Sequence, residues 1–180
     1  MTNYARFKAN GEVSYGVVEG NTVTKITGSP FQSYNSTNDS YAVSDVKLLS
    51  PTNPSKVVAI GLNYKSHLGG RPGPEAPEPF LKASTSVIGN GDEIIIPKAA
   101  INEKVKIQPE AELAVVIGKE CKGATQANAL DFVFAYTCGN DVSARDWQQN
   151  DLQWARAKSS DTFGPIGPWM TTDLDPTNIQ

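Results

Sequence analysis

The sequence is poor in cysteine, histidine and long apolar runs. Its 180 residues include two cysteines, Cys121 and Cys138, and a single histidine. The spacing of the cysteines fits neither a disulfide framework nor a metal cluster, so we expect both to be buried as small hydrophobic side chains. The longest apolar runs, such as residues 57–62, are far too short to span a bilayer, and residues 1–8 lack the apolar core of a signal peptide. We therefore expect a cytoplasmic protein, or a mitochondrial one, without a membrane partner.

An excess of charge of one sign is also missing. Lysine and arginine number 16 against 19 aspartates and glutamates, which leaves a formal net charge of -3. No run of like charges occurs, so nothing in the electrostatics predicts nucleic acid as a partner. The length is sufficient for one domain with a sizeable core, with or without a small appendage.

The first part of the chain has the pattern of a small antiparallel meander. Residues 4–8, 13–18 and 22–26 alternate apolar and polar side chains, with turn signals between them. Residues 28–44 are rich in small polar residues, glycine and proline, which predicts a surface connection. We place a boundary near residues 51–54, with a small N-terminal β domain and linker at 1–50 and the main domain at 51–180.

The main domain is predicted to be mixed β with short helices, an α+β fold. Expected strands are residues 56–62, 80–82, 92–97, 110–118, 132–138 and 169–172. Expected helices are residues 64–68, capped by Asn63, residues 125–131, and a segment after Ser143 in which Asp146 completes a capping box. Residues 69–79 are rich in glycine and proline, which fits either a lid over a site or a plain surface loop.

Two glutamates stand at the start of an otherwise apolar strand. Side chains alternate along a strand, so Glu110 and Glu112 point to the same face. Taken alone, this pattern favours a solvated strand end. If the two are partly buried, they need a shared proton, a cation or a basic partner.

A third carboxylate follows a neighbouring predicted strand. Asp141 comes directly after the turn at residues 139–140. Oxygen ligands favour Mg²⁺, Mn²⁺ or Ca²⁺ over zinc. Carboxylates leave coordination positions open, so a bound cation could act as a Lewis acid on a carbonyl or enolate oxygen.

Four motifs in order resemble those of the fumarylacetoacetate hydrolase family. They are residues 61–67 (GLNYKSH), 110–118 (EAELAVVIG), 140–148 (NDVSARDWQ) and 158–165 (KSSDTFGP). The resemblance implies a β-roll fold, usually as a homodimer, preceded by a small N-terminal β unit. It also implies Mg²⁺ or a similar ion on Glu110, Glu112 and Asp141, and a small 2-oxo acid or 1,3-dicarbonyl as substrate.

The resemblance implies roles for further residues as well. By position, Tyr64, Arg145, Gln148 and Lys158 fall where the family binds substrate, His67 falls where it has a general base, and Lys158 also fits a catalytic role. Each has a simpler alternative. His67 could be a surface helix residue, Arg145 could pair with Asp146 or Glu110, and Lys158 could be a solvated loop lysine.

The sequence departs from the family pattern in two places. Gly70 stands where hydrolytic members carry the acidic partner of the histidine, so Glu75 or Glu78 would have to replace it, and tautomerase, isomerase or decarboxylase chemistry is favoured over carbon–carbon hydrolysis. The C-terminal strands and a Thr-Gly-Thr-Pro loop are missing, so we expect a fragment of a longer enzyme. The alternative to an enzyme is a non-catalytic truncated homologue that binds a partner or is inert.

Overall fold

Strands dominate the fold, and short helices connect them. The computed structural model describes residues 1–179; Gln180, the last residue of the expected main domain, lies outside the described residues. The strands are β1 (Asn3–Ala9), β2 (Glu12–Glu19), β3 (Thr22–Ile26), β4 (Ser36–Ala42), β5 (Lys47–Leu49), β6 (Val57–Gly61), β7 (Glu78–Lys82), β8 (Val87–Ile88), β9 (Ile107–Gln108), β10 (Ala111–Ile117), β11 (Val133–Asn140), β12 (Ser143–Ala144) and β13 (Gly164–Thr171). The α-helices are α1 (Lys65–Leu68), α2 (Lys98–Asn102), α3 (Arg145–Asn150) and α4 (Ala155–Ser159), with 3₁₀ turns at Val43–Asp45, Ser84–Ser86 and Ala129–Phe132.

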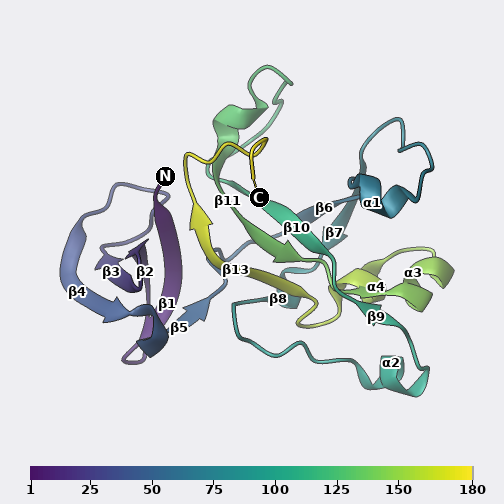
Figure 1. Cartoon of the computed structure of the whole chain (residues 1–180), viewed down its shortest axis with the longest axis horizontal. Helices are drawn as coiled ribbons and strands as arrows, with labels where there is room; N and C mark the ends of the chain where they lie inside the picture. The colour runs from purple at the N-terminus through teal and green to yellow at the C-terminus, as the bar shows by residue number, and fades with distance from the viewer. Residues whose placement is uncertain (180) are drawn as a thin grey trace.

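One large sheet runs through both parts of the chain. Its order is β10-β11-β13-β1-β2-β3-β4, with β5 paired to β1 and β8 paired to β13. The link between the two parts is the antiparallel contact of β1 with β13, where Asn3 lies opposite Thr171 and Tyr4 opposite Met170. The boundary expected near residues 51–54 falls in the connection between β5 and β6. Strands from both sides of that boundary therefore share one hydrogen-bonded sheet (Figure 1).

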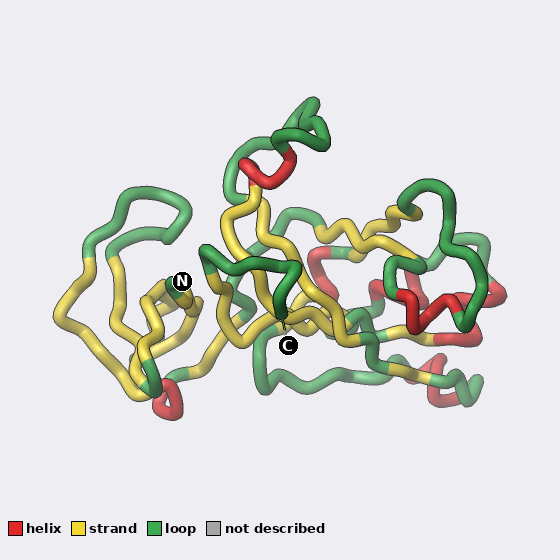
Figure 2. The backbone as a smooth tube through the Cα atoms, turned by 45° about the horizontal axis from the view of Figure 1, so that its top comes forward, coloured by secondary structure: helices red, strands yellow, loops and turns green. Residues whose placement is uncertain are grey.

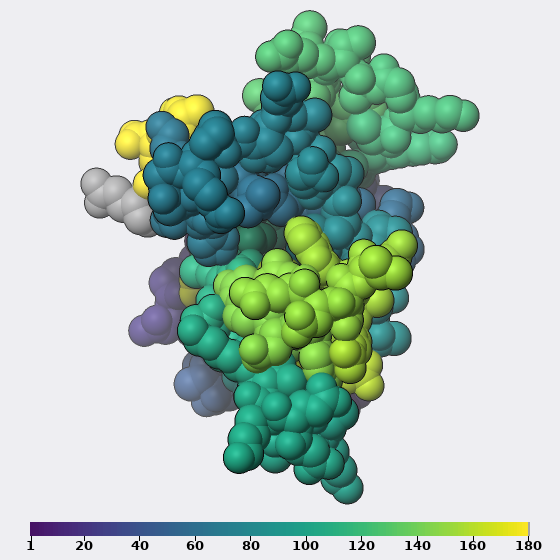
Figure 3. Space-filling view, turned by 90° about the vertical axis from the view of Figure 1, so that its right-hand side faces the viewer, coloured from purple at the N-terminus to yellow at the C-terminus, as the bar shows by residue number. Residues whose placement is uncertain are grey.

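The α-helices α1 to α4 lie at the end of the molecule opposite the N-terminal strands, whereas the 3₁₀ turns are spread over the fold (Figure 2). Two small sheets lie at this end as well, β6 with β7 and β9 with β12. Figure 3, which faces this end, shows the segment of α1 and its following loop beside the α3–α4 segment. None of the helices described within residues 1–179 is long and apolar enough to cross a membrane.

Three apolar clusters hold these layers together. One lies within the N-terminal strands around Phe7 and Val23, both fully buried. The second joins the two parts, because Tyr4 and Ile26 pack against Val116, Ala135 and Met170. The third packs α3 and α4 beneath the β9–β12 pair and consists of Ala100, Val142, Ala144, Trp147, Ala157 and Phe163. Burial of apolar surface thus fixes the strand ends from which the polar residues project.

The predicted fold class is confirmed, and so are most strands. The expected meander corresponds to β1, β2 and β3, and the strands expected at 56–62, 80–82, 132–138 and 169–172 correspond to β6, β7, β11 and β13. The surface connection expected at 28–44 is wrong in part, because residues 36–42 form β4. This edge strand is mostly polar, with Tyr41 packed against Phe7, and its pairing with β3 includes a hydrogen bond between Thr24 and Ser40 hydroxyls of 3.0 Å. Ladder pairing therefore outweighs its poor strand composition.

Three other local expectations are wrong. Residues 92–97 form no strand, and the Ile95 N–H donates to the Thr162 hydroxyl at 2.8 Å instead of to a ladder. The helix expected at 125–131 is only a 3₁₀ turn, Ala129–Phe132, because the Asn128 side chain accepts the Thr125 N–H at 2.7 Å and forms a local turn. Cys121 and Cys138 are both exposed rather than buried.

Candidate metal centre

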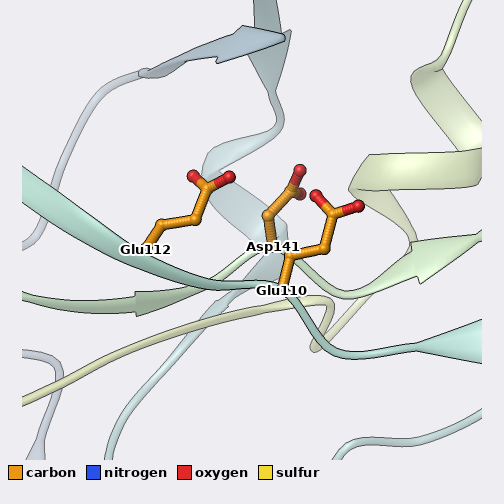
Figure 4. A group of neighbouring side chains, drawn as sticks. All are labelled: Glu110, Glu112 and Asp141. Atoms are coloured by element: carbon orange, nitrogen blue, oxygen red, sulfur yellow. The ribbon is translucent and has the colours of Figure 1, made fainter. Parts of the chain in front are cut away.

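Three carboxylates converge where β10 begins and β11 ends. Glu110 directly precedes β10, Glu112 lies two residues further on the same side, and Asp141 follows β11. The Asp141 N–H donates to the Glu110 carbonyl at 2.9 Å, and the Glu110 N–H donates to the Asn140 side-chain oxygen at 3.1 Å. One carboxylate oxygen of each residue lies within 4.8 Å of the other two. Figure 4 shows all three side chains directed to the same side of the strand, with Asp141 between the two glutamates.

A buried lysine from α4 contacts two of the three carboxylates. Lys158 is only 2% exposed, and its Nζ lies 2.8 Å from Glu110 Oε2 and 2.5 Å from Asp141 Oδ2. The same ammonium donates to Ser143 Oγ at 2.6 Å. The alternative that Lys158 is a solvated loop residue is therefore wrong. The helix α4 brings its charge into the carboxylate cluster.

A second buried lysine, Lys82 at the end of β7, was not among the residues expected at the site. Its Nζ lies 2.6 Å from Asp141 Oδ1 and also donates to the backbone carbonyl of Lys158. Burial lowers the pKa of Lys82, and the neighbouring Asp141 carboxylate works in the opposite direction without cancelling this effect. Strand alternation could have indicated that Lys82 is buried, because it places Lys82 on the same face of β7 as Phe80. In the structure Leu81, on the other face, is 66% exposed.

Arg145 lies at the edge of the cluster and is held by three side chains. Its guanidinium forms an ion pair with Glu110 Oε1, and it donates to Gln108 Oε1 at 2.7 Å and Gln148 Oε1 at 2.8 Å. Of the two pairings that the sequence left open for Arg145, the structure shows the one with Glu110. Gln148 belongs to the same network, and its amide nitrogen is left as a donor.

The capping box predicted for α3 is wrong. Ser143 is part of the short strand β12, and the helix begins after Ala144 without a side-chain cap. The Ser143 hydroxyl is used by Lys158 and by the Asp141 carbonyl, to which it donates at 2.8 Å. Asp146 instead accepts the backbone N–H of Lys106 at 2.6 Å. Both side chains are thus occupied by contacts other than a helix cap.

The two glutamates have opposite electrostatic environments. Burial raises the pKa of Glu110, but its hydrogen bonds and ion pairs with Lys158 and Arg145 outweigh burial, so this pKa lies below its ordinary value. Burial, together with the charges of Asp141 and Glu110, raises the pKa of Glu112 to about 7. Within residues 1–179 the Glu112 carboxylate has no hydrogen-bond or ion-pair partner. A half-buried carboxylate without a cation beside two others fits a divalent ion, because an added positive charge would pair with Glu112 and offset its repulsion by Glu110 and Asp141.

Tyr64 and His67 lie on a different segment, around α1. The Tyr64 hydroxyl accepts the backbone N–H of Leu113 at 2.9 Å, next to Glu112 on β10. His67 is exposed and its ring lies 6.5 Å from that of Tyr64, centroid to centroid. In the described part of the chain, His67 forms no hydrogen bond or ion pair with the three carboxylates. The cap predicted for Asn63 is wrong as well, because the helix starts after Tyr64 without a side-chain cap.

The loop after α1 is exposed along residues 69–79. Gly70 has a φ of 83°, a left-handed conformation that a glutamate would adopt only with strain. The backbone at this position therefore suits the glycine that the sequence carries. Glu75 and Glu78, the two residues considered as replacements for an acidic partner of His67, are both exposed.

Sequence profiles of known families match both parts of the chain. The sequence profile described as "Fumarylacetoacetate (FAA) hydrolase C-terminal" matches residues 56–180, and one described as "Rv2993c-like, N-terminal" matches residues 3–51. The chain is 48% identical over 158 residues to Protein Rv2993c of Mycobacterium tuberculosis, covering 86% of this chain and 58% of that protein. It is 43% identical over 176 residues to an uncharacterised protein of Archaeoglobus fulgidus, covering 97% of this chain and 65% of that one. The chain therefore spans only part of the length of these relatives.

Solved structures give the same result. The structure is similar to that of a 5-carboxymethyl-2-hydroxymuconate delta-isomerase from Mycobacterium smegmatis, with a TM-score of 0.86, 42% identity, and coverage of 97% of this chain and 68% of that one. A maleylpyruvate hydrolase from Sphingobium, in complex with manganese(II) and pyruvate, matches with a TM-score of 0.72, 26% identity, and coverage of 95% and 67%. Because the family profile covers more than half of the residues, the chain belongs to the fumarylacetoacetate hydrolase family.

Proposed function

We propose that the protein is a divalent-metal-dependent enzyme that acts on a small 2-oxo acid or 1,3-dicarbonyl compound through an enolate. The observation that carries this proposal is the convergence of Glu110, Glu112 and Asp141, whose ligand oxygens lie within 4.8 Å of one another. Mg²⁺ is the proposed ion, with Mn²⁺ or Ca²⁺ as substitutes, since the ligands are all carboxylate oxygens. The complex of the Sphingobium hydrolase with manganese and pyruvate supports both the type of ion and the type of ligand.

When bound, the cation would supply Lewis-acid stabilisation of a carbonyl or enolate oxygen. The protein's own residues would do the rest. The three N–H groups of Lys158 are taken by Glu110, Asp141 and Ser143. Its buried ammonium can therefore stabilise negative charge on a nearby substrate oxygen through space rather than by a hydrogen bond. Arg145 and Gln148 sit at the rim as donors for a substrate carboxylate, and Tyr64 borders the same strand.

His67 is the proposed general base. It is exposed on α1, so this role requires the segment of residues 64–79 to move toward the carboxylates. Position 70 is a glycine in a backbone conformation that suits glycine, so the histidine has no acidic partner three residues after it. We therefore propose tautomerisation, isomerisation or decarboxylation ahead of carbon–carbon hydrolysis. The similarity to an isomerase supports this order.

Metal binding tests the proposal directly. Titration of Mn²⁺ into the purified chain, followed by calorimetry, should show binding, and Glu112→Gln should weaken it at least about tenfold. Glu93→Gln, at an exposed glutamate outside the cluster, is the matched control and should bind like the original chain. Equal affinities of the Glu112 variant and the original chain would remove Glu112 from the site.

A pair of reactions tests the chemistry. Enol–keto conversion of oxaloacetate should require Mg²⁺ or Mn²⁺ and exceed cleavage of an acylpyruvate by the same preparation. Fast acylpyruvate cleavage that is lost in His67→Ala would instead make the protein a hydrolase despite Gly70. The homodimer implied by the family resemblance stays a prediction, which sedimentation velocity of the purified chain would test.

A further inference from the structure

Each oxygen of two of the carboxylates already has a cationic partner. Asp141 is contacted by Lys82 through Oδ1 and by Lys158 through Oδ2. Glu110 is contacted by Arg145 through Oε1 and by Lys158 through Oε2. The side chains of both lysines are at most 5% exposed, so these are buried rather than solvated ion pairs. The cluster thus holds its own counter-ions.

The formal charges of this cluster cancel. Three carboxylates, from Glu110, Glu112 and Asp141, face three cations, from Lys82, Lys158 and Arg145. In a buried site the surrounding water and salt screen charge weakly, so an imbalance is costly. A divalent ion would add two positive charges to a balanced site. A ligand that brings two negative charges would restore the balance.

We propose that Lys82, acting with Lys158, makes tight metal binding conditional on a dianionic ligand. Lys82 reaches the cluster from β7 and forms its ion pair with Asp141, so it acts through that carboxylate and is a positioning residue. The dianion has the chemistry of oxalate, or of a 2-oxo acid in its enolate form, with one carboxylate and one further anionic oxygen. This inference rests on the proposed function. It adds that metal and substrate bind as a coupled pair, each raising the affinity of the other by the same factor.

The experiment measures Mn²⁺ affinity by calorimetry with and without oxalate, at about pH 8, where Glu112 is ionised. In the original chain, oxalate should raise Mn²⁺ affinity at least about tenfold. Lys82→Met removes one internal positive charge, so it should bind Mn²⁺ alone at least about fivefold more tightly and gain less from oxalate. A purely structural role for Lys82 predicts the opposite, weaker binding of Mn²⁺ alone, because Asp141 would lose its support.

Two further variants control for charge and folding. Lys56→Met changes an exposed lysine that directly precedes β6, the strand paired with β7. This variant should bind Mn²⁺ and oxalate like the original chain. Lys82→Arg keeps the charge and should keep the weak binding of Mn²⁺ alone together with the large effect of oxalate. If Lys82→Met does not unfold cooperatively, the original chain still decides. Oxalate should then strengthen Mn²⁺ binding more than the monoanion glycolate does, after each effect is divided by that ligand's own affinity for Mn²⁺ in water.

The outcomes separate this inference from the proposed function. Tight Mn²⁺ binding that does not depend on oxalate, or weaker binding of Mn²⁺ alone by Lys82→Met, overturns the inference and leaves the metal enzyme in place. Absence of Mn²⁺ binding both with and without oxalate overturns the two together.

Discussion

At the N-terminal end of the large sheet, Lys25 pairs with Glu12 at 2.9 Å on the surface, whereas at the other end Lys158 pairs with Glu110 at 2.8 Å in the interior. The distances are the same within 0.1 Å, but the surroundings differ. Glu12 is 65% exposed, and water and salt screen its pair, so the pair contributes little to stability. Around Lys158 the desolvation cost is large, and each charge depends on its partners.

The two ends of the molecule therefore differ in what they bury, apolar side chains at one end and charged groups at the other. The N-terminal strands are held by apolar clusters in which Phe7, Val23 and Ile26 are almost completely buried, with charges left outside. The carboxylate cluster keeps charges inside at an energetic cost that stability alone does not explain. Buried charges that are costly to maintain are typical of sites that bind an ion or a charged ligand. The comparison predicts which substitutions will affect stability, which will affect metal binding, and which will affect neither.

The largest effect is expected from Lys158→Met. It leaves two buried carboxylates, Glu110 and Asp141, without a shared cation, so the metal-free chain should lose about 3–5 kcal/mol of unfolding free energy. Urea unfolding followed by circular dichroism measures this loss. A loss as small as that of a surface pair would show that the interior of the site is well hydrated and would remove the contrast between the two ends.

The second effect concerns pH. The pKa of Glu112 is raised to about 7 from an ordinary value of 4.5, so between these values the folded chain holds a proton that the unfolded chain releases. The stabilisation from this proton is fully present below the lower value and is lost as the pH rises through about 7. Stability of the metal-free chain should thus fall between about pH 5 and about pH 8.

Metal binding should depend on pH in the opposite direction. Mn²⁺ competes with the proton on Glu112, so its affinity should rise about tenfold from about pH 6 to about pH 8. Calorimetry at the two pH values gives the ratio. Glu112→Gln cannot hold that proton and should lose both the stability slope and the change in affinity; an unchanged slope would assign the titration to another group.

Ile26→Val tests the apolar cluster that joins the two parts of the chain. Ile26 is 2% exposed, and removal of one buried methylene should cost about 0.5–1.5 kcal/mol. Because the cluster lies away from the charged site, Mn²⁺ affinity of the folded variant should stay unchanged. Thermal unfolding measures the change in stability, and calorimetry measures the affinity for Mn²⁺. A large loss of affinity would show that this apolar cluster and the carboxylate cluster are coupled.

The smallest effect is expected from Lys25→Met. The surface pair with Glu12 is exposed, so its removal should change the urea midpoint by no more than the error of the measurement. Comparison with Lys158→Met, the same substitution in a buried pair, measures the effect of burial on a lysine–glutamate contact. Equal losses of unfolding free energy in the two variants would contradict the expected difference between the surface pair and the buried pair.

The sequence predicted the elements with strong periodicity and missed those that depend on neighbours. The alternation in residues 4–26 and the apolar runs of β6 and β11 were sufficient for strands. β4 was missed because its polar residues become a strand only by pairing with β3. The run at 92–97 has strand composition but no partner strand in the described structure, and Thr162 takes its N–H instead.

For the site, the sequence by itself determined the carboxylates. Two-residue alternation places Glu110 and Glu112 on one side, and the motif around Asp141 adds the third carboxylate. Only the tertiary structure decided what faces them. Lys82 and Lys158 are 76 residues apart, on β7 and α4, and they meet at Asp141 because the β6–β7 pair and the α3–α4 segment close over the same strand ends. Local patterns encode which face a side chain takes, but the charges opposite that face depend on contacts distant in sequence.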